Sequence, residues 1–247
     1  MPDLTVLILG GTGEARALAA TLQAEGTWRV ISSLAGRVSS PALPVGEVRI
    51  GGFGGPAALA EWLHSERIAA VVDATHPFAA RISASAAQAA PAAGVPLLML
   101  RRPGWTAGPH DRWQRVPDMA AAAESLRALE GPVLLTTGRG GLAVFRDLPH
   151  RFVIRTVDPP EPPLPADHVL VLARGPYTVE SELSLLREHA VRTLVTKDSG
   201  GEMTAGKLAA ARELGIAVVM VDRPPVEPGV PCVTEPSDVL AWLRELR

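Results

Sequence analysis

Apolar and polar positions along the chain follow two alternating patterns. Short β-branched apolar runs, typical of buried strands, alternate with alanine- and leucine-rich segments that have helical spacing. The ten runs, five in each half, are residues 6–9, 28–33, 48–50, 69–74, 96–100, 132–137, 152–157, 168–172, 193–196 and 217–221. The helical segments are residues 14–25, 56–66, 79–93, 119–129, 179–188, 205–214 and 237–246. This order predicts an α/β fold with mostly parallel sheets flanked by helices.

A stretch rich in turn residues separates the two series of strands. It reads Arg-Arg-Pro-Gly-Trp-Thr-Ala-Gly-Pro over residues 101–109, which puts a domain boundary near residue 105. We therefore expect two Rossmann-like lobes, residues 1–105 and 106–247, with a ligand cleft between them. The Pro-rich stretch at residues 158–165 lies between two strands of the second series, so we expect a stiff surface loop rather than a linker.

Composition and charge narrow the function classes. With 47% hydrophobic residues among 247, the chain can build a globular core. A formal net charge of -2 gives no global attraction to nucleic acid. Without a signal peptide or a long apolar run, we expect a cytoplasmic protein that does not enter membranes. A single cysteine, Cys232, and histidines without ligand spacing predict no bound metal. A monomer is the working expectation, although the sequence does not determine the oligomeric state.

A glycine-rich turn follows the first predicted strand and precedes a helix. Its residues are Gly10, Gly11, Thr12, Gly13 and Glu14. Backbone donors and the helix dipole favour a phosphate at such a turn. The match to the dinucleotide motif G-x-G-x-x-G is imperfect, because Arg16 occupies the third glycine position. Spacing alone leaves nucleotide binding and an ordinary tight turn as equal alternatives.

The segment around the second predicted strand helps to distinguish between NAD and NADP as the cofactor. In NAD-binding folds an acidic residue about 20 positions beyond the glycine motif binds the adenosine ribose. No acid occurs between residues 27 and 46 here, where the chain instead offers Ser33 and Arg37. A hydroxyl and a guanidinium suit the 2'-phosphate of NADP, so the predicted cofactor is NADPH. Alternatively, Arg37 is a solvated cation in a loop. The position of Arg37 after the second predicted strand favours binding to the 2'-phosphate over this alternative.

Polar residues also follow the fourth predicted strand, at residues 73–76. Open α/β sheets bind ligands at the carboxyl ends of their strands, so Thr75 and His76 are candidate contacts to the nicotinamide half of the cofactor. The structural alternative is that His76 bonds the local backbone. Asp73 is expected to act as a hydrogen-bond acceptor at the strand end rather than as a catalytic base.

These motifs together resemble the precorrin-6A reductase family. The resemblance rests on Gly-Gly-Thr-Gly-Glu-Ala-Arg at residues 10–16 and Asp-Ala-Thr-His-Pro-Phe-Ala at residues 73–79. Further matches follow in order at residues 136–138, 175–177, 196–201, 207 and 223–224, so the resemblance covers nearly the whole chain. It implies a two-lobed enzyme that transfers hydride from NADPH to a ring D double bond of a corrin precursor.

The resemblance also implies a tetrapyrrole substrate whose many carboxylates are held by the second lobe. Charge-assisted bonds from basic groups would clamp the edge of the macrocycle. The expected substrate-binding residues are Thr137, Gly138, Arg139, Arg174, Lys197, Ser199, Gly200, Lys207 and Arg223. One departure follows Arg139, where Gly140 and Gly141 replace the more polar continuation that the family pattern leads us to expect.

A near match to a P-loop occurs at residues 201–208. Leu208 replaces the serine or threonine that coordinates magnesium, and Glu202 would add negative charge beside a triphosphate, so we disfavour triphosphate binding. The segment could instead bind a carboxylate through Lys207. A structural alternative is that Thr204 caps the following helix.

Double-bond reduction also requires a proton, and the sequence does not choose its donor. His76, Tyr177 and Lys197 are candidates. A short-chain dehydrogenase mechanism would need a Tyr-x-x-x-Lys pair, whereas the only tyrosine, Tyr177, has Ser181 at that spacing. A non-catalytic NADP-binding sensor stays open as a second alternative.

Overall fold

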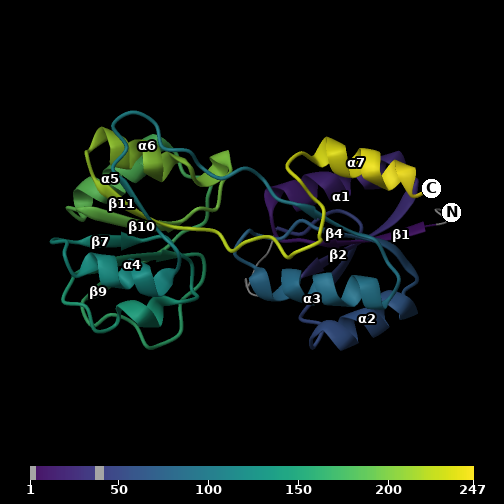
Figure 1. The fold of residues 1–247 in the computed structure, drawn as a ribbon. Coiled ribbons are helices and arrows are strands. Elements are labelled where there is room, and N and C mark those ends of the chain that lie inside the picture. Colours follow the sequence, from purple (N-terminus) through teal and green to yellow (C-terminus); the bar gives the residue numbers. More distant parts are fainter. Residues whose placement is uncertain (1–3, 37–41) are drawn as a thin grey trace. The chain divides into compact units, whose positions relative to one another are not determined.

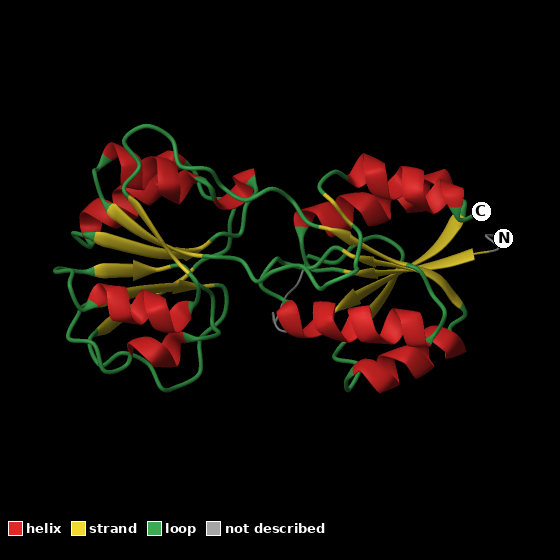
Figure 2. Cartoon of the chain, in the orientation of Figure 1, coloured by secondary structure: helices red, strands yellow, loops and turns green. Residues whose placement is uncertain are grey.

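The computed structural model describes residues 4–36 and 42–247. The chain divides into two compact units, which are drawn in Figure 1. Unit 1 consists of residues 1–103 and 224–247, and unit 2 consists of residues 104–223. In each unit a parallel sheet is covered by helices on both faces, as Figure 2 shows. The expected α/β class with two Rossmann-like lobes is confirmed.

Unit 1 contains a parallel sheet of six strands in the order β12-β5-β4-β1-β2-β3. The strands are β1 (Leu4–Leu9), β2 (Trp28–Leu34), β3 (Glu47–Ile50), β4 (Ile68–Asp73), β5 (Leu97–Leu100) and β12 (Cys232–Val233). The central strands read as continuous apolar runs because both of their faces are buried.

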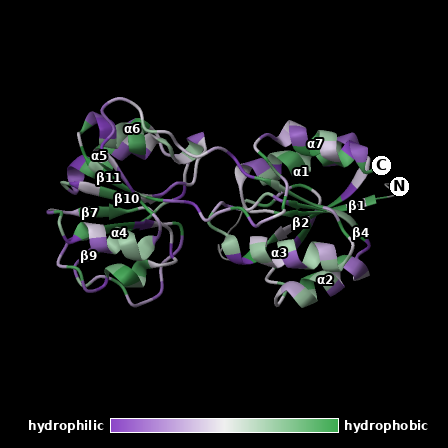
Figure 3. Ribbon diagram, in the orientation of Figure 1, coloured by the Kyte–Doolittle hydropathy of each residue, from purple (hydrophilic) through white to green (hydrophobic). Residues whose placement is uncertain are grey.

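Helices cover both faces of this sheet. They are α1 (Gly13–Glu25) and α7 (Pro236–Glu245) on one face, and α2 (Pro56–Ser65) and α3 (Ala80–Ala92) on the other. Alternate residues of β1 serve the two faces: Val6 and Ile8 belong to the core under α1 and α7, and Leu7 and Leu9 to the core under α2 and α3. Figure 3 shows apolar residues concentrated along the strands and polar ones on the outer helix surfaces.

Unit 2 has a second parallel sheet of six strands, in the order β6-β11-β10-β7-β8-β9. The strands are β6 (Trp113–Val116), β7 (Val133–Leu135), β8 (Phe152–Thr156), β9 (His168–Leu172), β10 (Thr193–Lys197) and β11 (Ala217–Val221). Its helices are α4 (Met119–Leu126), α5 (Val179–Glu188) and α6 (Gly206–Glu213), with short 3-10 helices η1 (Leu142–Phe145) and η2 (Glu202–Thr204).

The sixth strand of each sheet comes from an unexpected part of the chain. Both sheets follow the doubly wound order 3-2-1-4-5-6. In unit 1 the sixth position is taken by β12, which comes after all of unit 2 in the sequence. In unit 2 it is taken by β6, which comes directly after the first five strands of unit 1. The two edge strands are thus exchanged along the chain.

This exchange corrects the expected lobe limits. The first crossing lies between Pro103 and Gly104, close to the expected residue 105, but residues 224–247 belong to unit 1 rather than to the second lobe. The physical reason is burial: Val239 and Leu243 of α7 are fully buried in the core that α1 shares. Strands β6 and β12 were missed because one is polar in its middle, at Gln114 and Arg115, and the other has two residues.

The exchange predicts that the last helix stabilises unit 1. Leu243→Ala should lower the free energy of unfolding by roughly 2 to 5 kcal/mol, because the leucine is fully buried in the core. Urea unfolding followed by tryptophan fluorescence measures the change.

A matched control lies three residues further on. Leu246 is 37% exposed, so Leu246→Ala should change stability by less than about 0.5 kcal/mol. Equal small losses from both variants would contradict the assignment of α7 to the core of unit 1.

Candidate functional site

The ends of β1 and β4 form the topological switch point of unit 1. These strands are neighbours in the sheet, and the chain leaves them toward opposite edges. Ligands of doubly wound sheets bind in the crevice outside such a point. The turn after β1 and the polar segment after β4 therefore meet at one edge, which brings together the predicted residues Gly10–Glu14 with Thr75 and His76.

The glycine turn leaves its backbone open to approach. Gly10 N donates to Ser33 O at 2.9 Å, which fixes the start of the turn against β2. Gly11 has φ +114°, a conformation that side chains other than glycine rarely adopt, and a Cβ added there would meet nothing within 4 Å. The donors at the start of α1 can thus be approached closely by a phosphate, so the turn fits a dinucleotide.

Thr12 joins the turn to the end of β4. Its hydroxyl accepts a hydrogen bond from Ala15 N at 3.1 Å, which makes it the N-cap of α1. The same hydroxyl donates to Ala74 O at 2.8 Å. Thr12 is buried, so its side chain has a structural role in the site, and its expected contact with the cofactor stays a prediction.

Glu14 lies in the first turn of α1, where a carboxylate would repel a phosphate. The structure pairs it with Arg102 at 2.8 Å, and both side chains are partly buried. Arg102 therefore offsets the negative charge at the helix end that is expected to bind pyrophosphate. Sequence reasoning named Glu14 as a cofactor residue and missed Arg102, which lies in the turn-rich stretch after β5.

Thr75 and Asp73 form a tight hydrogen-bonded unit at the end of β4. Asp73 Oδ1 accepts from Thr75 N at 3.1 Å and from Thr75 Oγ1 at 2.6 Å. The expectation that Asp73 is a strand-end acceptor is therefore confirmed. His76 is exposed, and its Nδ1 accepts from Phe78 N at 3.2 Å, which is the local backbone bond named as its structural alternative. That bond puts the proton of the neutral ring on Nε2.

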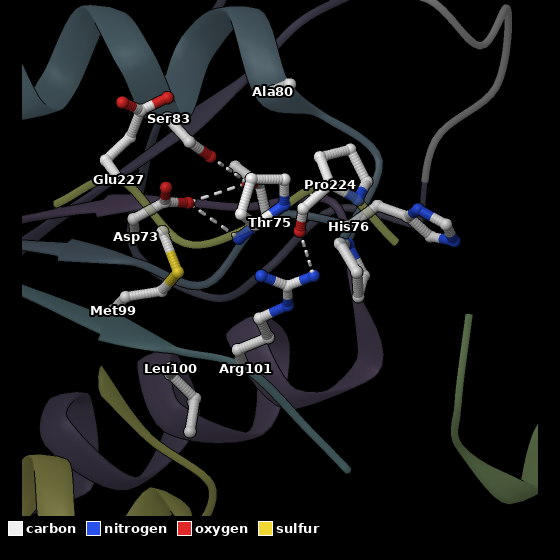
Figure 4. A pocket seen from close by; sticks show the side chains of 12 residues that line it. Asp73, Thr75, His76, Ala80, Ser83, Met99, Leu100, Arg101, Pro224 and Glu227 are labelled. Atoms are coloured by element: carbon white, nitrogen blue, oxygen red, sulfur yellow. Dashed lines mark hydrogen bonds between the residues drawn. The ribbon is translucent and has the colours of Figure 1, made fainter. Parts of the chain in front are cut away.

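A small pocket opens beside this unit, with a volume of about 100 Å³ (Figure 4). Its walls come from the end of β4, the start of α3, the end of β5 and the connection that leads to β12. Ligand sites usually measure about 300–1,000 Å³, so this pocket suits one end of a larger ligand. The lining residues are Asp73, Thr75, His76, Pro77, Ala80, Ser83, Met99, Leu100, Arg101, Pro224, Pro225 and Glu227.

Of the two residues expected to select NADPH, the structure describes only Ser33. Ser33, in β2, is 6% exposed, and its carbonyl oxygen holds Gly10. Its observed role is therefore to position the turn through its backbone. Arg37 lies outside the described residues, so its contact with a 2'-phosphate stays a prediction.

Unit 2 has an equivalent switch point between β7 and β10. The loops after these strands carry five of the expected substrate residues, Thr137, Gly138 and Arg139 after β7 and Ser199 and Gly200 after β10, with Lys197 at the end of β10 itself. Arg139 and Arg174 are exposed and Lys197 is half-buried. Arg174 follows β9, the outermost strand of the sheet, and therefore lies at the same carboxyl edge, two strands away from β7.

The environment of Lys207 differs from the one expected for a residue that binds a substrate carboxylate. It is 3% exposed, its Nζ donates to Thr204 O at 2.6 Å, and Nζ lies 4.5 Å from the centroid of the Trp105 ring. Burial, with a smaller contribution from the positive charge of Arg155, lowers the pKa of Lys207 to about 7, and Glu182 opposes this shift. Thr204 does not cap α6, because the N-cap is Ala205 and makes no side-chain bond.

Arg223 is held within unit 2 by Asp198. Its Nε donates to Asp198 O at 3.1 Å, and its guanidinium lies 3.6 Å from Asp198 Oδ1. This contact fixes the second crossing of the chain. Arg223 therefore has a structural role in unit 2, and its contact with the substrate stays a prediction.

Tyr177 is a poor candidate for the proton donor. Its hydroxyl donates to Ala173 O at 2.7 Å, and Arg155 lies over its ring at 3.9 Å from the centroid. Burial raises the pKa of Tyr177 above its usual value, which makes the phenol a weaker acid at neutral pH.

Two charged clusters were missed by sequence reasoning. Asp198 accepts from Trp105 N at 2.9 Å and from Arg115 at 2.8 Å, so it also holds the segment that follows the first crossing. Arg155 and Glu182 form a buried bidentate pair with both bonds at 2.9 Å. No local signal in the sequence reveals these pairs, because their partners lie 27 to 93 residues apart.

The fold and the open glycine turn define a Rossmann-type α/β protein whose first unit has a phosphate-compatible switch point. A family model described as "Precorrin-6x reductase CbiJ/CobK" matches residues 5–244. The chain therefore belongs to the precorrin-6x reductase CbiJ/CobK family, and the resemblance noted in the sequence is confirmed. This membership makes it an oxidoreductase of cobalamin biosynthesis, a reductase class that points to a nicotinamide cofactor.

Individual relatives agree with this assignment. The chain is 51% identical over 242 residues to "Precorrin-6A reductase" of Rhodococcus erythropolis, covering 98% of both chains. It is 30% identical over 256 residues to "Cobalt-precorrin-6A reductase" of Priestia megaterium, covering 98% of this chain and 99% of that one. A solved structure described as "CobK precorrin-6A reductase" superposes with a TM-score of 0.90 at 42% identity, covering 98% of this chain and 97% of that one.

No helix among residues 4–36 and 42–247 is long and apolar enough to cross a membrane. Within the same ranges, no three His, Cys, Asp or Glu side chains are grouped so that they could hold a metal ion.

The buried amine predicts a specific pH dependence of stability. An unfolded lysine has a pKa of about 10.4, so between about pH 7 and pH 10 the unfolded chain holds one proton more at Lys207 than the folded chain does. The free energy of unfolding should therefore rise with pH in this window, by up to about 1.4 kcal/mol per pH unit from this group, and the contribution should be constant below pH 7. Lys207→Met should remove that rise, which urea unfolding at several pH values measures.

Lys197→Met is the matched control, because Lys197 is the other of the two lysines in the chain and is half-buried. This variant should keep the parental dependence on pH. A parental slope in Lys207→Met would show that the amine is charged in the folded chain at pH 9.

Proposed function

We propose that this protein reduces precorrin-6A with NADPH, transferring hydride to a ring D double bond and giving precorrin-6B. The observation that carries the proposal is the open switch point of unit 1 in a chain of this reductase family. NADPH supplies the hydride when it is bound, so the protein has to hold and orient the two reactants.

The first unit has the features that dinucleotide binding requires. Donors at the start of α1, beside Gly11 and Gly13, would hold the pyrophosphate, and the ion pair between Glu14 and Arg102 lowers the repulsion there. Thr75 and His76 line the neighbouring pocket, where the nicotinamide end would lie. Thr12 keeps these two parts together through its bond to Ala74 O.

Several residues of the second unit suit the carboxylates of a tetrapyrrole. Arg139, Arg174 and Lys197 lie at or beyond the carboxyl ends of β7, β9 and β10, where parallel sheets bind ligands. Cations in these positions would fix the edge of the macrocycle by charge-assisted hydrogen bonds. Lys207 is excluded from this group, because its ammonium is buried against Thr204 O.

The metal-free substrate is favoured by the relatives. Chains called precorrin-6A reductase reach 51% and 44% identity, in Rhodococcus erythropolis and Rhodobacter capsulatus, whereas the one called cobalt-precorrin-6A reductase in Priestia megaterium reaches 30%.

As the donor of the proton, His76 is favoured over Tyr177. The His76 ring is exposed at the pocket wall, whereas the hydroxyl of Tyr177 is already engaged in a hydrogen bond to Ala173 O.

The two alternatives have less support. A short-chain dehydrogenase mechanism would use Tyr177 as its acid, but Ser181 stands where the partner lysine is required. A non-catalytic NADP sensor would not need cations at the carboxyl edge of unit 2. A cytoplasmic location and a monomeric state stay predictions from the sequence.

The first test concerns the choice of cofactor. Arg37→Ala should raise the dissociation constant of NADPH by roughly 10- to 150-fold, because one charge-assisted contact to the 2'-phosphate is lost. NADH lacks that phosphate and should bind the variant as it binds the parent. Fluorescence titration with both cofactors measures the effect, and equal weakening of the two would refute NADPH selection by Arg37.

The second test concerns the substrate. Lys197→Ala should raise the KM for precorrin-6A or slow turnover by roughly 10-fold or more, through loss of one bond to a carboxylate. NADPH affinity and thermal stability should stay parental. Reduction is followed anaerobically by the decrease in NADPH absorbance.

Arg187→Ala removes a surface cation of α5 and serves as the control, with parental kinetics expected. Unchanged kinetics in Lys197→Ala would remove this residue from the substrate site. Loss of NADPH binding in the same variant would instead indicate that unit 2 binds the cofactor and that unit 1 binds the substrate.

A further inference from the structure

Asp73 differs from the other buried acids of this protein. Three acidic residues are buried among the described residues: Asp73, Glu182 and Asp198. Glu182 is paired with Arg155 through both oxygens, and Asp198 is paired with Arg115 and Arg223. Asp73 has no ion pair in the described part of the chain, and its Oδ2 is buried without any hydrogen-bond partner there.

An unsatisfied carboxylate oxygen is costly inside a protein. Burial removes its hydration, and nearly all buried polar atoms in folded proteins find a partner. The other oxygen of Asp73 shows that the side chain is fixed, since Oδ1 accepts two hydrogen bonds from Thr75. The position of Oδ2 is thus held in place while its acceptor capacity stays unused, so this atom can accept a hydrogen bond from a ligand group.

The surroundings of Asp73 limit the chemistry of that group. Asp73 lines the pocket of about 100 Å³ beside the ends of β4 and β5, together with Arg101 and the apolar side chains Met99 and Leu100 (Figure 4). A second carboxylate, Glu227, lies on the same wall. The two acids outnumber the one guanidinium of Arg101 in this lining, so the pocket has no excess of positive charge to attract a carboxylate or phosphate, and it suits a flat, mostly apolar group with an N–H donor.

We propose that Asp73 Oδ2 accepts a hydrogen bond from the carboxamide NH2 of the nicotinamide ring. This inference rests on the proposed function, in which Thr75 and His76 adjoin the nicotinamide end. Within the nicotinamide half of the dinucleotide, the carboxamide is the group that offers a neutral N–H donor next to an aromatic ring. Asp73 is therefore a cofactor-positioning residue, because its bond would fix the rotation of the ring and hence the face that is presented to the substrate.

A cofactor analogue tests this bond directly. In the 3-acetylpyridine analogue of NADP+ a methyl group replaces the carboxamide NH2, so the donor is lost while the ring and both phosphate groups are kept. The parent protein should bind NADP+ roughly 10-fold or more tightly than the analogue, as expected for a hydrogen bond to a charged acceptor. Isothermal titration without substrate measures both affinities.

Asp73→Asn is the matched variant. The asparagine can keep Oδ1 as the acceptor for Thr75 and replaces only Oδ2, which becomes an NH2 group that cannot accept. NADP+ should then bind roughly 10-fold or more weakly, and the ratio between NADP+ and the analogue should fall to about one. Glu227→Gln makes the same chemical change on the pocket wall and should keep the parental ratio.

A third ligand separates the failure of this inference from the failure of the proposed function. Adenosine 2',5'-bisphosphate has no nicotinamide, so it should bind the parent and Asp73→Asn equally if the turn and the fold are intact. Equal affinity of the parent for NADP+ and the analogue would overturn the inference without depending on any variant. A parental ratio in Asp73→Asn, or loss of the ratio in Glu227→Gln instead, would overturn it as well. If the parent binds none of the three ligands, the proposed function fails and the inference fails with it.

Discussion

One buried hydroxyl group organises the site of unit 1. Thr12 accepts a hydrogen bond from Ala15 N and donates one to Ala74 O, so it joins the first turn of α1 to the end of β4. The N–H groups at the helix start therefore point to the same edge as the pocket beside Asp73. Gly10, bonded to Ser33 O, adds β2 to this arrangement. The position of a ligand that spans the turn and the pocket depends on these few bonds.

The exchanged edge strands impose a second constraint. Each sheet is completed by a segment that lies outside its own series of strands, so neither series makes a complete sheet by itself. Within unit 2, Asp198 holds both Trp105 and Arg223, one beside each crossing. Within unit 1, Arg101 donates to Pro224 O at 2.6 Å and joins the same two connections. In each unit, such bonds thus join the two segments through which the chain enters and leaves that unit.

The sequence predicted most elements of the fold, because β-branched runs and alanine-rich helices have different periods. It missed β6 and β12, since a strand that lies at a sheet edge, such as Trp113–Val116, needs no apolar run. It located the glycine turn after β1 and Thr75 after β4, because these positions follow from local order along the chain, and their contacts with a cofactor stay predictions. It could not predict the burial of Lys207 or the pairing of Arg155 with Glu182, which depend on the packing of α6 and α5. Contacts between distant segments leave no periodic signal.

The carboxyl edges of the two sheets differ in their electrostatics. In unit 1 the acid nearest the glycine turn, Glu14, is offset by Arg102, and the pocket beside it has two acidic residues, Asp73 and Glu227, against one basic residue, Arg101. In unit 2 the corresponding edge has the cations Arg139, Arg174 and Lys197. With a net charge of -2 the protein as a whole does not attract a polyanionic substrate, so attraction has to come from such local placement. Carboxylates are accordingly favoured at the edge of unit 2, and a neutral N–H donor is favoured in the pocket of unit 1.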